Sequence, residues 1–547
     1  MFVLSAYNQA VVDRSSFQFL RWSSRLPALA LAGTLCVCCG VRAQAPADSA
    51  GGPGHILLVL PFDNKSGQPS LDWIREAAPE VLTSRFSSAG FAPLSRADRL
   101  YALDHLGLPQ GFQPSRASAL KLSQTMDVDS IVVGSYQTDG TQIEAEARVV
   151  DVTHLRMGEP IRANGDMRNL IAVFDSLAWK LTRQVDPQFG GSEETFVAAG
   201  ANLQVEAFEQ YIRGITEPDQ AERLRHLQEA VKSSPDLGAA WMALGREDYT
   251  EQQYEDAATA FSKVTGNNAD ALEAGFYRGL SLMFSGNYAK AEIAFSGVAR
   301  VLPLAPVLNN QGVAISRQGH DGTALFRQAV AADPTAADYH FNLAVSMKRH
   351  NDEAGAIGEL AQYLKMRPND SEALELDSAW KSPGAASSAE PLERIVRAFD
   401  AVAFRQAAVM MDEMKSTRLA ALTPEKRAQT LASQARDYLS RGLLLEAERL
   451  YQAAVAADGQ VEEAHEGLAE VRERTGDAGG ARKEAQAALE LRPTSEAYLV
   501  LARLDVAADH LDDATRDAGE ALKLNPNSQA AQGVLRQVSA RQGQVKQ

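Results

Sequence analysis

Cysteine is scarce in this sequence, and every cysteine lies near the start. Cys36, Cys38 and Cys39 are the only three among 547 residues. A chain that loses this region by processing has no disulfide, no thiol nucleophile and no cysteine metal ligand. Burial of apolar surface alone must then hold the fold, and a chain of this length can bury enough.

Residues 1–43 predict a secretory signal peptide. Arg14, Arg21 and Arg25 precede an uncharged apolar run from Leu26 to Val41, and small polar residues follow it. Cleavage after Ala43 is favoured over cleavage after Ala45, which would leave Pro46 next to the cut. The run is shorter than the roughly 20 residues of a membrane span. An uncleaved anchor and a lipidated cysteine remain alternatives, and either would associate the chain with a membrane.

Other features are also missing. The chain carries a formal charge of −16 and has no long run of Lys and Arg, which argues against nucleic-acid binding. The sequence contains no Gly-x-Ser-x-Gly, Gly-x-Gly-x-x-Gly or His-Glu-x-x-His motif, and its nine histidines are scattered singly. We therefore expect no enzyme activity, no catalytic residue, no metal and no cofactor. Aromatic residues make up only 7%, and alanine is abundant after residue 200, which favours closely packed helices.

Residues 55–187 predict an α/β domain. Ile56 to Leu60 are consecutive apolar residues, as in a strand buried on both faces. A hairpin with an Asp139-Gly140 turn is predicted over 129–152, with Ile143, Ala145, Ala147 and Val149 facing inward. The remaining predicted elements are helices over 71–89, 96–126 and 169–185 and short strands over 91–95 and 159–163.

The loop after the first strand resembles a known family. Pro61, Phe62, Asn64, Ser66 and Gly67 match the best marker of the domain that opens the TolB translocation protein, and the resemblance extends over about 130 residues. It implies an α/β fold and a bacterial envelope location. Nothing here resembles the β-propeller into which TolB continues, so a Tol-Pal role does not follow.

The same loop could bind a small ligand. The candidate ligand residues are Asp63, Asn64, Ser66 and Gly67. It is not a P-loop, because Lys65 and Ser66 precede the glycine. The alternative is a structural turn, in which Asn and Asp bond their own backbone and Gly67 adopts a positive φ.

Residues 205–527 repeat with a period of 34. Tyr254, Ala257, Phe261 and Val264 recur as Tyr288, Ala291, Phe295 and Val298. This pattern resembles the tetratricopeptide repeat. Small residues such as Gly245, Gly279, Gly312 and Ala344 fall where two helices cross, and prolines such as Pro303 and Pro334 end the second helix.

These patterns predict a multidomain chain, with an α/β domain followed by an all-α solenoid of eight repeats in two arrays. The boundaries are a linker at 188–204, a first array at 205–370, a linker at 371–390, a degenerate repeat and second array at 391–527, and a capping helix at 528–547.

Partners of such repeats usually lie along the first helix of each pair. Projected onto this sequence, that face consists of Arg246, Tyr249, Phe276, Met283, Asn309, Arg317, Phe341, Lys348 and Arg349. Aromatic residues mixed with arginine are typical of interface hot spots. The alternative is that several of them pack between repeats. The Lys-Asn-Asn-Lys-Arg clamp for a terminal carboxylate is not found.

The sequence therefore favours a non-catalytic exported scaffold or adaptor that binds proteins or peptides in the bacterial cell envelope, most simply the periplasm. The alternative is a sensor or an accessory subunit of an envelope enzyme or secretion system, with a small-molecule site in the α/β domain.

Overall fold

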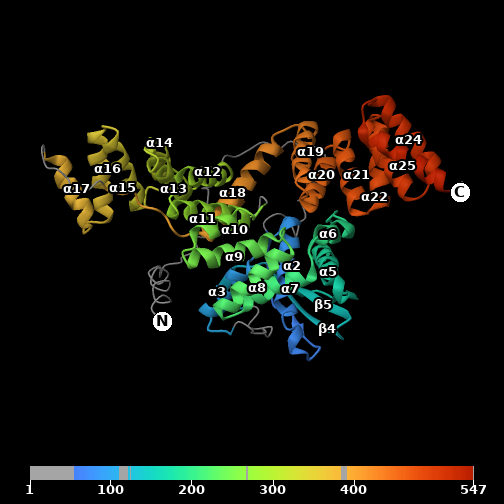
Figure 1. The fold of residues 1–547 in the computed structure, drawn as a ribbon, viewed down its shortest axis with the longest axis horizontal. Coiled ribbons are helices and arrows are strands. Elements are labelled where there is room, and N and C mark those ends of the chain that lie inside the picture. The colour runs from blue at the N-terminus through green and yellow to red at the C-terminus, as the bar shows by residue number, and fades with distance from the viewer. Residues whose placement is uncertain are drawn as a thin grey trace, which may run out of the picture. The chain divides into compact units, whose positions relative to one another are not determined.

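The structure is a computed structural model that describes residues 55–109, 121–122, 125–154, 156–265, 269–382 and 391–545 (Figure 1). The predicted signal peptide lies outside the described residues. Among the helices of the described part, none is long and apolar enough to cross a membrane.

The amino-terminal region contains a mixed sheet. β1 (Ile56–Val59) pairs in parallel with β3 (Ala92–Pro93) and with β4 (Ser130–Thr138), and β2 (Asp63–Asn64) also pairs in parallel with β4. β5 (Gln142–Asp151) is antiparallel to β4 and pairs on its other side with β6 (Arg156–Met157) and β7 (Ile161–Asp166). The predicted strands, including the hairpin, are present.

Helices cover both faces of the parallel part of this sheet. α2 (Ile74–Ser88) and α5 (Leu170–Val185) pack on one face, where Phe62 and Phe174 are fully buried. α3 (Arg96–His105) packs on the other face, beside Leu58 and Ile131. The predicted inward residues of β5 are buried against α5, because side chains alternate along a strand.

A helix lies inside the predicted linker 188–204. α6 (Glu193–Gly200) begins after Ser192, whose hydroxyl accepts a hydrogen bond from the Thr195 N–H at 3.1 Å. Phe196 is fully buried and meets Phe189 edge to face, with 5.8 Å between ring centroids. This stretch is therefore packed and capped, and it differs from the predicted linker.

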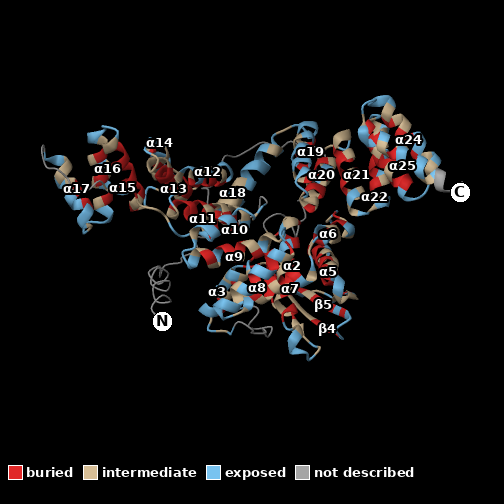
Figure 2. Cartoon of the chain, in the orientation of Figure 1, coloured by how far each residue is buried: buried red, intermediate tan, exposed pale blue. Residues whose placement is uncertain are grey.

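The rest of the described chain consists mainly of paired helices. The first array contains α7 (Val205–Thr216) with α8 (Gln220–Ser233), α9 (Gly238–Thr250) with α10 (Tyr254–Phe261), α11 (Ala269–Phe284) with α12 (Tyr288–Val301), α13 (Ala305–Ser316) with α14 (Thr323–Ala332), and α15 (Ala337–Arg349) with α16 (Glu353–Met366). The later elements are α17 (Ser371–Lys381), α18 (Ala401–Ala420), α19 (Pro424–Ser440) with α20 (Leu444–Ala457), α21 (Glu462–Thr475) with α22 (Ala478–Leu491), α23 (Ser495–Ala507) with α24 (Leu511–Leu524), and α25 (Gln529–Val545). Buried residues follow the inner faces of the pairs (Figure 2).

Small residues allow the helices of a pair to approach, as the repeat pattern predicts. A Cβ added to Gly245, Gly279 or Gly312 would lie 2.8, 2.6 or 2.8 Å from the ring of Phe261, Phe295 or Phe326. Each ring therefore lies so close to the glycine that a larger residue would push the two helices apart.

Two predictions between the arrays need correction. Residues 371–381 form α17 and are not a linker. Residues 391–400 contain neither helix nor strand, so the expected degenerate repeat keeps only one helix, α18. Pro391 has no N–H donor, and the N–H groups of Arg394 and Val396 bond to asparagine side chains of the first array. These backbone N–H groups therefore have hydrogen-bond partners although the chain is extended and forms no helix.

Candidate peptide-binding groove

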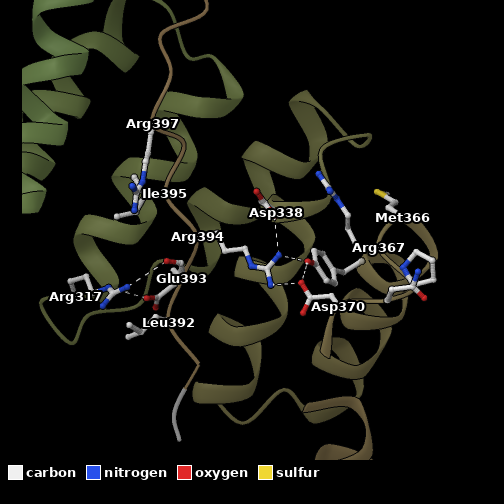
Figure 3. Close-up of a pocket in the computed structure, with 13 residues that line it drawn as sticks. Arg317, Asp338, Met366, Arg367, Asp370, Leu392, Glu393, Arg394, Ile395 and Arg397 are labelled. Atoms are coloured by element: carbon white, nitrogen blue, oxygen red, sulfur yellow. Dashed lines mark hydrogen bonds and ion pairs between the residues drawn. The ribbon is translucent and has the colours of Figure 1, made fainter. Parts of the chain in front are cut away.

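Residues 391–400, which we call the internal segment, run as an extended chain across the first array (Figure 3). The Pro391 carbonyl contacts Arg349 at the end of α15, the Arg394 backbone contacts α13 and α15, and Phe399 contacts Phe276 of α11. The segment thus crosses the first helix of three successive repeats. We call the surface that it covers the groove.

Two asparagines hold the backbone of the internal segment. Asn342 accepts from the Arg394 N–H and donates to the Arg394 carbonyl, both at 2.7 Å. Asn310 accepts from the Val396 N–H at 2.9 Å and donates to the Val396 carbonyl at 2.8 Å. Each amide therefore pairs with one residue of the segment in the way that a neighbouring strand would.

A third asparagine connects these contacts. Asn309 donates to the Arg394 carbonyl at 3.1 Å and accepts from Asn342 at 2.7 Å. Asn309, Asn310 and Asn342 are all fully buried. A buried amide that lacks hydrogen-bond partners costs about 1–3 kcal/mol, and here the internal segment supplies the partners. These side chains suit an extended peptide backbone.

A basic pocket takes the side chain of Glu393, which is fully buried. Arg349 and Ser316 donate to its carboxylate, and Arg317 forms an ion pair at 3.1 Å without hydrogen-bond geometry. Arg349 also donates to the Pro391 carbonyl at 2.8 Å. A buried carboxylate is tolerated only when such partners replace water.

An acidic and aromatic pocket takes Arg394 on the opposite side of the segment (Figure 3). Its guanidinium lies 2.9 Å from Asp370 and 3.2 Å from Asp338, and it stacks 4.1 Å from the ring centroid of Phe341. Burial alone would raise the pKa of Asp370, but hydrogen bonds from Tyr363, the Ala373 N–H and Arg394 lower it to about 2. Asp370 is therefore charged at neutral pH.

Apolar contacts follow these two charged residues along the segment. Ile395 and Val396 pack against buried residues of the first array. Phe399 lies 5.7 Å from Phe276 and 4.0 Å from Phe404 of α18 between ring centroids. A cavity of about 840 Å³ lies beside the segment, between Arg317, Arg367 and Leu392.

The predicted partner face lies partly in this groove. The predicted residues that contact the internal segment are Phe276, Asn309, Arg317, Phe341 and Arg349. The others are described by different contacts. Arg246 pairs with Glu273 at 2.6 Å and Lys348 with Glu353 at 2.7 Å, and Tyr249 packs on Tyr254 and Tyr277. Met283 is buried in the hydrophobic cluster on which Ile395 and Phe399 also pack. Binding of a partner by any of them stays a prediction.

The sequence prediction missed Asn310, Asn342, Ser316, Asp338 and Asp370. A signal for two of them is present in the repeat pattern. Asn310 and Asn342 each stand two residues before the small residue of their helix, Gly312 or Ala344. Asparagine at the same position of consecutive repeats indicates that this face binds polar groups.

The candidate ligand loop has the geometry of an internally bonded turn. Asn64 donates to Asp72 at 2.7 Å and accepts from the Ser66 N–H at 2.9 Å, and the Ser66 hydroxyl accepts from the Thr138 N–H at 3.0 Å. Gly67 has a φ of +68°. Burial raises the pKa of the Asp63 carboxyl. A ligand at this loop stays a prediction. The described residues contain no group of three or more potential metal ligands.

Comparisons with known proteins agree with the repeat pattern. The sequence model of the tetratricopeptide repeat family matches residues 242–306, 317–371 and 433–496. The chain therefore contains tetratricopeptide repeats in both arrays, and such repeats are typical of scaffolds for protein–protein interaction. Nothing among the curated proteins matched.

Several solved structures are similar. YrrB, described as a TPR protein with an unusual peptide-binding site, is 16% identical, with a TM-score of 0.28 over 32% of this chain and 90% of that chain. MamA from Desulfovibrio magneticus RS-1 is 22% identical, with a TM-score of 0.28 over 31% of this chain and 99% of that chain. The TPR2AB domain of yeast Sti1 is 13% identical, with a TM-score of 0.20 over 56% of this chain and 100% of that chain.

Proposed function

We propose that this protein is a non-catalytic scaffold that binds an extended segment of a partner protein in the groove of its first array. One observation carries this proposal. Three buried asparagines present their amides to a polypeptide backbone, and residues 391–396 occupy them. Backbone contacts give affinity for any extended chain, and the flanking pockets select side chains, as in other modes of strand recognition.

The proposal includes a place in the bacterial envelope, with export to the periplasm. Its support is the predicted signal peptide over 1–43 and the resemblance of residues 55–187 to the opening domain of TolB. The α/β domain would then contact a second envelope component while the first array holds the partner. Fractionation of cells that express the full chain tests this location. Recovery with cytosolic markers would contradict it.

Crosslinking in intact envelopes tests the scaffold function. The full chain is used as bait beside Asn342→Ala, which removes the amide that pairs with Arg394, and the control Asn527→Ala in an exposed turn. We expect the wild type and the control to capture the same proteins and Asn342→Ala to lose at least one. Identical capture by all three chains would reject the groove as the binding surface.

A further inference from the structure

The groove holds a stretch of the chain's own sequence. We propose that the groove recognises an extended peptide with an acidic residue, a basic residue and two aliphatic residues in that order, and that the internal segment, with Glu393-Arg394-Ile395-Val396, is an intramolecular copy of this peptide that a partner must displace. This inference rests on the proposed function and adds a sequence preference and a means of control.

Backbone contacts fix the register of the bound peptide. Asn342 pairs with Arg394 and Asn310 with Val396, two residues further along. Successive side chains of an extended chain point to opposite sides. A peptide shifted by one residue would therefore direct its acidic side chain to the wrong pocket.

The charges of the two pockets fix the order of the acidic and the basic residue. Arg317 and Arg349 face Glu393, whereas Asp338, Asp370 and Glu372 face Arg394. A peptide with the two residues exchanged would bring like charges together in both pockets. Repulsion between like charges disfavours a wrong peptide more strongly than attraction between opposite charges favours the right one.

The chemistry after the charged pair is apolar. Ile395 and Val396 pack on the array, and Phe399 packs among the rings of Phe276, Tyr277 and Phe404. We therefore expect the partner to supply an acidic-basic pair followed by aliphatic residues and then an aromatic residue, within a stretch that is extended when bound.

The internal segment can leave the groove without loss of regular structure. Residues 391–400 contain no helix or strand, and the segment is joined directly to α18. Its attachment to the same chain gives it an effective concentration in the millimolar range. The apparent affinity for a partner is therefore the affinity of the open groove multiplied by the fraction of molecules in which the groove is open.

A peptide titration tests the inference on the full chain. The probe is a fluorescent synthetic peptide of residues 391–400, and the readout is anisotropy. The proteins are the wild type and the released variant, defined as Glu393→Arg/Arg394→Glu, which keeps the net charge and all groove residues. We expect the released variant to bind the probe at least about tenfold more tightly, because its own segment no longer competes.

Two results would overturn the inference. One is equal affinity of both chains for the probe, including no binding by either. The other is that the released variant binds the probe and a second peptide, in which Glu and Arg are exchanged, with equal affinity. Either result would leave the envelope crosslinking contrast between Asn342→Ala and Asn527→Ala as a separate test of the scaffold function.

A measurement on the unmodified chain guards against a misfolded variant. Hydrogen exchange of residues 391–398 is followed in the wild type with and without an excess of unlabelled peptide. We expect the added peptide to accelerate exchange at the Arg394 and Val396 amides, which bond to Asn342 and Asn310. Unchanged exchange at saturating peptide would contradict displacement.

Discussion

At the residue scale, the groove is defined by two oppositely charged neighbours in the sequence. Glu393 is 4% exposed and has three polar partners, and Arg394 lies between carboxylates and two aromatic rings. Removal of one partner of a buried charge costs about 3–5 kcal/mol when the charge stays buried. The internal segment can avoid that cost by leaving the groove.

Arg349→Leu should therefore release the internal segment rather than unfold the array. Arg349 bonds to the Glu393 carboxylate and to the Pro391 carbonyl, so its loss weakens both. We expect trypsin to cleave after Arg394 and Arg397 at least several-fold faster than in the wild type. Arg300→Leu, at an exposed position of α12, is the control. Equal cleavage rates in the two variants would contradict this role.

Glycines of the repeats allow a second test at this scale. Gly279→Ala places a Cβ 2.6 Å from the Phe295 ring, and such overpacking costs about 1–3 kcal/mol. Gly297→Ala in α12 meets nothing within 4 Å, and the same change in a helix stabilises by about 0.5–1 kcal/mol. In urea unfolding followed by circular dichroism, the midpoint of Gly279→Ala should fall below that of the wild type, and the midpoint of Gly297→Ala should rise above it. A shift in the same direction would argue against close packing at Gly279.

The sequence alone predicts packing residues better than binding residues. Gly245, Gly279 and Gly312 are identifiable because packing recurs with the period of the repeat. Ser316 and Asp370 contact the internal segment from places that the period does not single out, near the end of α13 and at the start of α17. Their role depends on a segment that returns to the array from a distance in sequence.

At the element scale, a side chain of the first helix of a repeat forms a hydrogen bond to the backbone of the turn before it. Trp241, His340 and His465 bond to the carbonyl oxygens of Pro235, Pro334 and Gly459, each six residues earlier, at 2.8, 3.1 and 3.3 Å. The two histidines also bond a glutamate of the next helix, Glu359 at 2.6 Å and Glu484 at 2.7 Å. One side chain thus joins three elements.

The second array should depend on pH through His465. Its hydrogen bond to Glu484 raises the pKa of the imidazole above the usual 6.5. The folded chain therefore binds this proton more tightly than the unfolded chain does. The stabilisation is complete below about pH 6.5 and is lost as the pH rises through the folded value.

Urea unfolding at several pH values checks this expectation. The difference in the free energy of unfolding between the wild type and His465→Gln should be larger at pH 6 than at pH 8, and it should change by at most about 1.4 kcal/mol per pH unit for one proton. His320→Gln, at an exposed position before α14, should behave as the wild type does. A difference that grows with pH would contradict the assignment.

Local patterns predicted elements well and missed those set by distant contacts. The hairpin of β4 and β5 and the paired helices follow from alternation and from the repeat period. The extended course of residues 391–400 does not follow from such patterns. Its backbone partners are distant in the sequence, since Asn342 precedes Arg394 by 52 residues and Asn310 precedes Val396 by 86. α6 is a similar case, since Phe196 is buried against other elements.

At the scale of the whole molecule, the two arrays differ at the position whose side chains hold the peptide backbone in the first array. This position lies two residues before the small residue in the first helix of a repeat, and in the first array it is occupied by Asn310 and Asn342. The corresponding residues of the second array are Gly467 and Val500, before Ala469 and Ala502. These residues offer no side-chain amide. The two arrays therefore share an architecture and are suited to different contacts.

The α/β domain and the first array share a core. Tyr211 of α7 donates to Glu80 of α2 at 2.9 Å, and Arg213 donates to the Ser70 carbonyl at 3.1 Å. Phe208 and Ile212 belong to the same buried cluster as Phe174. The first repeat is therefore atypical because its outer face packs on the α/β domain.

Peptide binding to the released variant, with and without Asn342→Ala, shows whether the groove holds an extended backbone. Asn342 makes two hydrogen bonds to the Arg394 backbone, and each contributes about 0.5–1.5 kcal/mol. We expect Asn342→Ala to weaken binding of the peptide of residues 391–400 by roughly tenfold or more, and Asn527→Ala to leave it unchanged. Equal binding by both variants would contradict the claim that this groove holds an extended peptide by its backbone.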